Sequence, residues 1–373
     1  MARKKKRFVV KDRAKTSLRL ALTALIVIAI VGALVSIVFA YKSCNVILTA
    51  RTVPLASSEL SCGTGDGILY VRNGMLNFFS YKDEDANFSK FLSVSPTGIV
   101  GTSGVKAVWS DTAIQIIDAP FDIQPKGYVR AVRAGSSHIA VCMRKNDGSD
   151  LLTVYSSSGQ EVYELAFAEG RLTGFGFSDS NGQTLWTMEL TVESGSPRTT
   201  VTTFDLSRMS ATGVITVTDQ LVEDVFFTSS SVFVVGTETL IRYSAAANRE
   251  IYRVQLHGYR VADRTVTGES VRLLLLPRNG GELTVARVLT VAQGDVASES
   301  AYTVTLEGAG YCCLYGGSLV IVGDTEVRIV DRSGETDDVL ALPVGSTLSS
   351  KKLDERHILI ERSGEFDLLT IGK

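Results

Sequence analysis

Histidine is the residue that most often binds metals or acts as a base near neutral pH, and this chain of 373 residues contains only three. His138, His257 and His357 lie far apart in the sequence, at no metal-ligand spacing. The zinc motif HExxH, the phosphate loop GxxxxGK[ST] and the nucleophile turn GxSxG are all missing. The sequence therefore predicts structural histidines and no catalytic residue, metal or cofactor.

Paired carboxylates would offer a different chemistry, because glycan hydrolysis uses two of them on either side of the bond that is cut. Asp66, Asp111 and Asp263 are candidates if the fold brings them together. Clustered acids with shifted pKa values would favour a glycan-active hydrolase or lyase. A mixed or apolar surface without such a cluster would favour a binding protein.

The five cysteines, an odd number, exclude a complete disulfide framework. Cys142 lies in an apolar strand and is expected to be a small buried residue. The adjacent Cys312 and Cys313 would point to opposite faces of a strand. We therefore expect free thiols at these positions.

The elements available to position any site are short strands. Runs such as Val232–Val235, Val271–Leu276 and Leu319–Val322 are rich in β-branched residues and are bounded by Gly, Ser, Asn or Asp. No convincing amphipathic helix follows residue 46. With 33 glycines and 45% hydrophobic residues, the composition indicates an all-β fold with many tight turns.

These strands recur about every 41 residues, which is the period of a four-stranded β-propeller blade. The most apolar strand of each repeat starts near Ile68, Val105, Ile139, Leu185, Val232, Val271, Leu319 and Ile358. Gly159, Gly334 and Asn248 end similar turns, where a positive φ is expected. The sequence predicts eight four-stranded blades, with seven as the alternative.

The last repeat contains only three strands before the chain stops. The extended segment 46–54 precedes the first complete repeat and would supply the missing outer strand of the eighth blade, which would close the ring. We therefore assign residues 46–373 to one propeller domain.

Charged residues on the predicted innermost strands would line the central channel, where propellers often bind ligands. The candidate ligand contacts are Arg130, Arg133, Arg260, Asp263 and Arg264, and Lys351 and Lys352 share this placement. Polar residues at strand ends are also ordinary on a solvated rim.

Before the repeats lies an apolar stretch, residues 20–41, in which only Thr23, Gly32 and Ser36 interrupt aliphatic residues, alanine and Phe39 up to residue 40. A helix of this length, about 32 Å, matches the thickness of a bilayer core, which predicts a transmembrane helix. Cleavage as a signal peptide is the main alternative, although the stretch exceeds the usual length of such a segment.

Charge predicts the orientation of this helix. Residues 1–19 hold nine of the 38 basic residues and one of the 40 acidic ones, so this basic arm is expected to stay in the cytoplasm. The remaining chain has 29 basic and 39 acidic residues, a net charge of about −10, which argues against nucleic acid as a partner. The predicted protein is single-pass, with an extracytoplasmic carboxy-terminal domain.

The repeat pattern across residues 46–373 resembles propellers of the quinoprotein-like and WD40-like superfamily. With the basic arm and single span, the chain is similar to membrane-anchored propeller proteins of Gram-positive bacteria. This resemblance implies a cell-envelope location and brings no assigned activity. The leading hypothesis is a non-enzymatic scaffold that binds an envelope protein or peptide. A glycan-active hydrolase or lyase and a ligand-sensing propeller are the alternatives.

Overall fold

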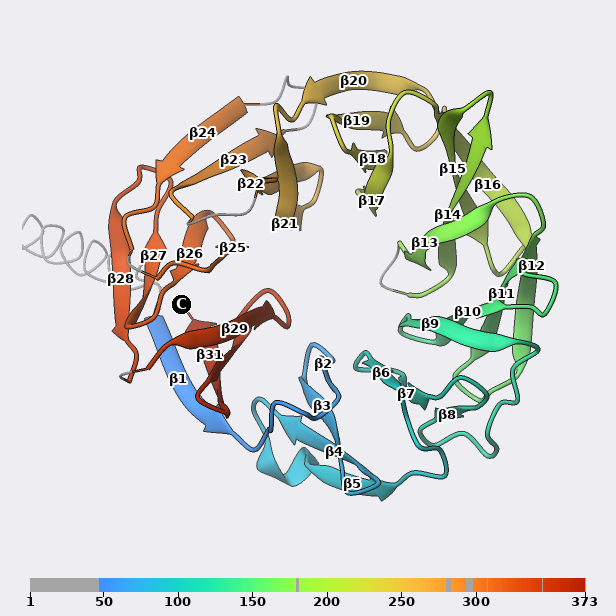
Figure 1. Ribbon diagram of the computed structural model, residues 1–373, viewed down its shortest axis with the longest axis horizontal. Coiled ribbons are helices and arrows are strands. Elements are labelled where there is room, and N and C mark those ends of the chain that lie inside the picture. Colours follow the sequence, from blue (N-terminus) through green and yellow to red (C-terminus); the bar gives the residue numbers. More distant parts are fainter. Residues whose placement is uncertain are drawn as a thin grey trace, which may run out of the picture.

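The computed structural model describes residues 47–178, 181–279, 283–292, 298–306, 308–343 and 345–372. In these ranges the strands form eight sheets arranged as a ring around a central channel (Figure 1). The basic arm and the predicted span of residues 20–41 lie outside the described residues. Within the described ranges, no helix has the length and apolar character needed to cross a bilayer.

Each sheet is an antiparallel blade whose first strand lies nearest the channel. Blade 1 contains β2 (Ser61–Gly63), β3 (Gly67–Arg72), β4 (Met75–Ser80) and β5 (Phe88–Phe91), with the 3-10 helix η1 (Glu84–Ala86) before β5. Blade 2 contains β6 (Gly98–Gly101), β7 (Lys106–Trp109) and β8 (Ile114–Ile116). Blade 3 contains β9 (Tyr128–Ala134), β10 (His138–Arg144), β11 (Asp150–Ser156) and β12 (Glu161–Phe167). Blade 4 contains β13 (Arg171–Phe177), β14 (Thr184–Glu193), β15 (Ser196–Asp205) and β16 (Ser210–Val217).

The second half of the ring continues the same pattern. Blade 5 contains β17 (Val222–Phe227), β18 (Ser231–Gly236), β19 (Thr239–Ser244) and β20 (Glu250–Gln255). Blade 6 contains β21 (Tyr259–Thr267), β22 (Ser270–Pro277), β23 (Val285–Val291) and β24 (Ser298–Thr303). Blade 7 contains β25 (Tyr311–Tyr315), β26 (Ser318–Val322), β27 (Glu326–Val330) and β28 (Thr336–Ala341). Blade 8 contains β29 (Thr347–Lys352), β30 (His357–Arg362), β31 (Glu365–Gly372) and β1 (Ile47–Val53).

The propeller prediction is confirmed, and the ring has eight blades rather than seven. The most apolar strand of each predicted repeat is the second strand of a blade. Its residues are buried on both faces because neighbouring blades pack against both sides of it, as in β10 and β18. The core therefore consists of apolar clusters between successive blades.

The eighth blade combines both ends of the described chain. Strand β1 pairs antiparallel with β31, from Ile47 opposite Gly372 to Val53 opposite Phe366. The chain thus closes the ring with hydrogen bonds between strands that are more than 300 residues apart in sequence, and β1 covers the edge that β31 would otherwise expose.

Blade 2 corrects the expectation of four strands in every blade. It has three, and its fourth place is taken by a single bridge between Ile114 and Ile123. Pro120 and Pro125 flank Ile123. Proline has no backbone N–H to donate to a ladder, so the outer segment forms no regular strand.

The turns and cysteines follow the sequence predictions. Gly159, Gly334 and Asn248 have positive φ values of 86°, 92° and 48°. All four cysteines in the described ranges, Cys62, Cys142, Cys312 and Cys313, are free thiols. Burial raises the pKa of Cys312 to about 12, as expected for a thiol that packs as an apolar group.

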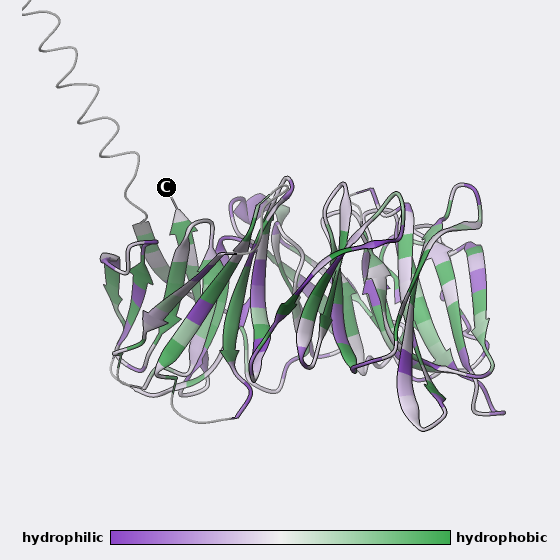
Figure 2. Cartoon of the chain, turned by 90° about the horizontal axis from the view of Figure 1, so that it is seen from above, coloured by the Kyte–Doolittle hydropathy of each residue, from purple (hydrophilic) through white to green (hydrophobic). Residues whose placement is uncertain are grey.

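The antiparallel order of each blade divides its turns between two faces of the disc (Figure 2). The first and third turns of every blade lie on one face, which we call the first-turn face. Because β31 is the third strand of its blade, it ends on this face, and so does the start of β1, which is paired with it. The residues before Ile47 therefore join the propeller at the first-turn face.

Candidate binding site in the central channel

A cavity of about 1340 Å³ lies beside the innermost strands of blades 6, 7 and 8. We call it the channel cavity. Its walls come from β21, from the first turns of blades 7 and 8 at Gly316–Gly317 and Leu353–Arg356, and from the third turn of blade 7 at Asp331–Arg332. All these turns belong to the first-turn face, so the cavity is built at that side of the disc. The channel edge of an innermost strand has no further strand to pair with, so its backbone groups bond to side chains or to water.

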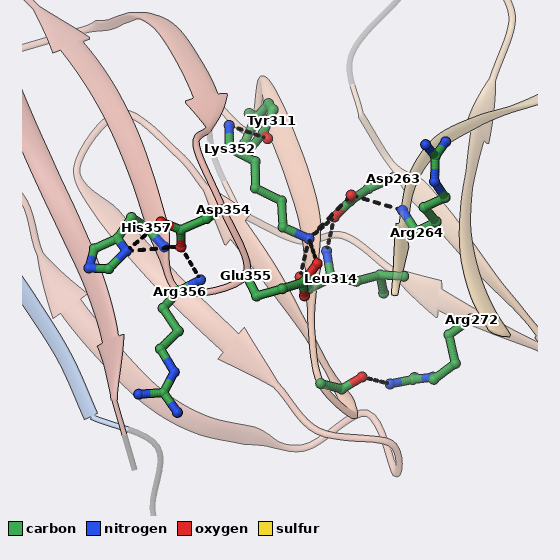
Figure 3. A network of polar contacts seen from close by, with 11 residues as sticks. Asp263, Arg264, Arg272, Tyr311, Leu314, Lys352, Asp354, Glu355, Arg356 and His357 are labelled. Carbon is green, nitrogen blue, oxygen red and sulfur yellow. Dashed lines mark hydrogen bonds and ion pairs between the residues drawn. The ribbon is translucent and has the colours of Figure 1, made fainter. Parts of the chain in front are cut away.

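At the channel edge of β25, two charged side chains from the neighbouring blades hold the backbone of Leu314, and we call this arrangement the clamp (Figure 3). Asp263 on β21 accepts a hydrogen bond of 2.7 Å from the backbone N–H of Leu314, and Lys352 on β29 donates one of 3.1 Å to the Leu314 carbonyl. Asp263 and Lys352 form an ion pair of 3.0 Å, with side chains 16% and 15% exposed. The clamp therefore links blades 6, 7 and 8. Asp263 and Lys352 are partners of each other and of the Leu314 backbone, which gives both a structural role.

A second ion pair lies between the channel cavity and a smaller cavity. Arg264 on β21 pairs with Asp224 on β17, and both residues line both cavities. The smaller cavity, about 560 Å³, also includes Arg133 and the aromatic residues Phe175 and Trp186. The guanidinium of Arg133 lies 5.8 Å from the centre of the Phe175 ring. The fold thus brings Arg133 and Arg264 together, although they are far apart in the sequence.

The other two predicted contacts lie elsewhere. Arg130 on β9 is 3.6 Å from Asp150, a fully buried carboxylate that also pairs with Arg144 at 2.6 Å. Asp150 accepts a hydrogen bond from the Leu172 backbone, so this group links blades 3 and 4. Arg260 is exposed near the start of β21 and does not line the channel cavity, although the next residue, Val261, does.

Of the three acids predicted for glycan chemistry, only one lies at the channel cavity. Asp66 and Asp111 do not line the channel cavity, whereas Asp263 does. Asp354, which also lines it, contacts the His357 ring at 2.9 Å. Partial burial works to raise the pKa of Asp354, yet hydrogen bonds from His357 and the Arg356 backbone outweigh it and lower that pKa. Such a carboxyl is a poor proton donor near neutral pH.

Two of the three histidines are buried and have structural surroundings. His357 is buried, and its ring stacks on Tyr81 of blade 1 with 3.8 Å between ring centres. His138 is buried, and its Nδ1 lies 3.1 Å from the Gly182 carbonyl of the next blade. The described residues contain no group of His, Cys, Asp and Glu side chains that could hold a metal ion.

Thr265, Arg272 and Arg332 are among the residues of the site that were not predicted from the sequence. Thr265 and Arg332 line the channel cavity, and Arg272 is buried beside it. Arg272 interrupts the apolar run Val271–Leu276. A charge in a buried strand is unusual, and this could have marked Arg272 as a candidate site residue. Arg332 lies in a third turn, whereas ligand contacts were predicted only on innermost strands.

No family model and no curated protein matches the sequence. Among solved structures, the chain is similar to the Pan2 WD40 domain of Neurospora crassa, with 10% identity, 88% of this chain and 96% of that chain covered, and a TM-score of 0.45. It is also similar to the Cps50 (Swd1) β-propeller domain of Myceliophteria thermophila, with 9% identity, 88% and 99% covered, and a TM-score of 0.48. At this similarity neither assigns a function to this chain. The propeller fold rests on the strand pairing described above.

Proposed function

We propose that this protein is a non-enzymatic scaffold that binds a protein or peptide segment at its channel cavity and is held at a membrane by residues 20–41. The observation that carries the proposal is the state of the cavity's charges. Asp263, Asp224 and Asp354 already contact Lys352, Arg264 and His357. Groups that are paired in this way hold blades together and present a surface, whereas a general acid or base must be available for proton transfer.

The size and lining of the cavity support a peptide as the occupant. Its volume of about 1340 Å³ exceeds that of most small-ligand pockets. Apolar residues such as Val261, Val266 and Tyr315 alternate there with charged and hydroxyl side chains. A mixed lining of this kind suits a segment with both apolar and polar side chains.

The place of the cavity adds a constraint on the partner. The cavity is built at the first-turn face, where the residues before Ile47 join the propeller. Only residues 42–46 separate that point from the predicted span, and an extended chain of this length reaches less than about 20 Å. We therefore expect a partner segment that lies close to the bilayer, on the extracytoplasmic side according to the charge of the basic arm. An envelope membrane protein is the partner that fits.

A photo-crosslinking residue placed at Glu355 in the full-length protein in native membranes tests the proposal. Glu355 lines the cavity, and its side chain is 63% exposed. Met209 is the matched control, because it is 60% exposed in the third turn of blade 4, on the same face but away from the cavity. We expect a discrete protein adduct from position 355 and none from position 209. No adduct, or the same adducts from both positions, would contradict the proposal.

A further inference from the structure

The interface between blades 6 and 7 contains two arginines, Arg272 and Arg332, that have no carboxylate partner within the described ranges. Arg272 on β22 is 8% exposed, and its guanidinium donates a hydrogen bond of 2.7 Å to the Gly316 carbonyl. Among the described residues this is its only hydrogen bond, although a guanidinium has five N–H groups to donate. Neither Arg272 nor Arg332 forms an ion pair within the described part of the chain.

Both guanidiniums lie against the same turn. Arg272 bonds to Gly316, and a β-carbon on Gly317 would lie 2.9 Å from Nε of Arg332, so glycine leaves the space that this side chain occupies. Burial, and then the nearby charge of Arg332, lower the pKa of the Arg272 guanidinium. Two cations held together without an anion are unfavourable, because each raises the cost of charging the other.

A buried hydroxyl next to them is also unpartnered. Thr265 is 9% exposed and lines the channel cavity, and its Oγ1 has no hydrogen-bond partner among the residues that the structure describes. Thr265 pairs with Arg272 across β21 and β22, so both side chains lie on the same face of blade 6. A buried hydroxyl without a partner is rare in folded proteins and costs stability, which calls for a polar group that the chain itself does not supply.

The acids nearest this site are engaged elsewhere. Asp263 is two residues before Thr265, and its carboxylate holds Lys352 and the Leu314 backbone. Asp331 precedes Arg332 and accepts hydrogen bonds from Ser333 and the Glu335 backbone within its own turn. Those bonds, that of the Ser333 hydroxyl first, lower the pKa of Asp331, so it stays an anion bound by its turn.

We propose that Thr265, Arg272 and Arg332 form the recognition site for an acidic side chain of a peptide that enters the channel cavity. Guanidinium groups bind carboxylates through strong, charge-assisted hydrogen bonds, and the Thr265 hydroxyl adds a donor. A peptide is a better fit than a free ion because Val261, Val266 and Leu353 give the same cavity an apolar wall. The inference rests on the proposed scaffold function and specifies the chemistry of its partner.

The test is a selection of displayed random peptides on the full-length protein in nanodiscs of phosphatidylcholine. We expect selected peptides to be enriched in Asp and Glu over the starting library. Their affinity should fall about tenfold with Arg332→Gln, the effect of losing one charge-assisted contact. Arg208→Gln is the control, since Arg208 lies on the same face, outside the cavity, with its side chain 78% exposed.

A second variant separates a ligand contact from a structural role. Thr265→Val keeps the shape of the side chain and removes the unpartnered hydroxyl. We expect it to weaken peptide binding several-fold while the melting temperature stays the same or rises. A lower melting temperature would show that the hydroxyl has a partner in the folded chain, which would overturn its assignment as a ligand contact.

The remaining outcomes distinguish the two proposals. If wild-type protein selects no peptide, the scaffold function fails. If it selects peptides without acidic enrichment, or binds them equally well with Arg332→Gln, the scaffold function stands and the acidic-site inference fails. If phosphatidylglycerol vesicles bind through Arg332 while peptides do not, the occupant is a lipid phosphate and the peptide assignment is wrong.

Discussion

Blade 6 meets its two neighbours at the first-turn face in opposite ways. Toward blade 5, Glu269 accepts hydrogen bonds from the hydroxyl groups of Thr228, Ser229 and Ser230 and from the Ser230 backbone. Toward blade 7, Arg272 has a single bond to a carbonyl. At the first interface the Glu269 carboxylate accepts hydrogen bonds on both of its oxygens. At the second, most N–H groups of the Arg272 guanidinium have no acceptor among the described residues.

This difference separates a structural contact from a prospective binding contact. A charge that is fully hydrogen-bonded within the fold stabilises the fold and has little left to offer a ligand. A charge with unused donors beside an open cavity gains more from a ligand than from its own chain. Both interfaces contain charged side chains next to hydroxyl groups, so the presence of a charge does not tell a satisfied interface from an unsatisfied one.

The largest expected effect concerns the clamp between blades 6, 7 and 8. Lys352→Met would leave Asp263 without its cation and the Leu314 carbonyl without its donor. Since both charged side chains are largely buried, we expect a loss of about 3 kcal/mol in the free energy of unfolding, measured by chemical denaturation. This would show that the paired charges on the blade 7 side stabilise the ring.

Lys126→Met is the matched control. Lys126 pairs with Glu161 and Glu164, but its side chain is half exposed, so the loss should be below about 1 kcal/mol. The double variant Asp263→Leu/Lys352→Met should be less destabilised than Lys352→Met, because no uncompensated charge remains. Equal losses in Lys352→Met and Lys126→Met would refute the clamp.

A smaller effect is expected at the blade 5 side. Hydrogen bonds from Ser229 and Ser230 lower the pKa of Glu269 from 4.5 to about 2. The folded state therefore favours the carboxylate, and its contribution to stability is present above pH 4.5 and lost as the pH falls toward 2. Glu269→Gln should cost about 1 kcal/mol at pH 7, after allowance for solvent screening.

The pH dependence is the measurement that decides this prediction. The difference in unfolding free energy between wild type and Glu269→Gln should shrink as the pH is lowered from 4.5 to 2. The exposed Glu365 provides the control, and Glu365→Gln should leave stability nearly unchanged at pH 7. A difference at Glu269 that stays constant with pH would contradict the role of its charge.

Much of this fold was predictable from the sequence because a propeller repeats one physical pattern. The second strand of each blade is buried on both faces, so Ile139 and Val232 begin apolar runs that mark their blades. The missing strand of blade 2 was harder to foresee. It depends on Pro120 and Pro125, which break a ladder locally and leave the repeat spacing intact.

The site was predicted less well, because the sequence shows which residues are charged but not which of them have an ion-pair or hydrogen-bond partner in the fold. Arg264 and Asp263 were placed on an innermost strand, and both line the channel cavity. Their partners Asp224 and Lys352 come from other blades, 40 residues or more away in the sequence. The same holds for Arg332. The sequence could not show that it lacks a carboxylate partner among the described residues, because this depends on which side chains the neighbouring blade places beside it.

The smallest change that sharpens the comparison is Gly317→Ala. The added β-carbon would meet the Arg332 side chain at 2.9 Å and displace its flexible guanidinium from the turn. The stability change should stay within about 0.5 kcal/mol, because the gain from a less flexible unfolded chain offsets the displacement. Gly310→Ala is the control in the same blade, since a β-carbon there meets only a carbonyl at 3.9 Å.

We expect the affinity for a selected acidic peptide, measured by calorimetry, to fall several-fold with Gly317→Ala and to stay unchanged with Gly310→Ala. Equal affinities would mean that the position of Arg332 against its turn does not matter, and the unmet charges of this interface would then have no role in binding.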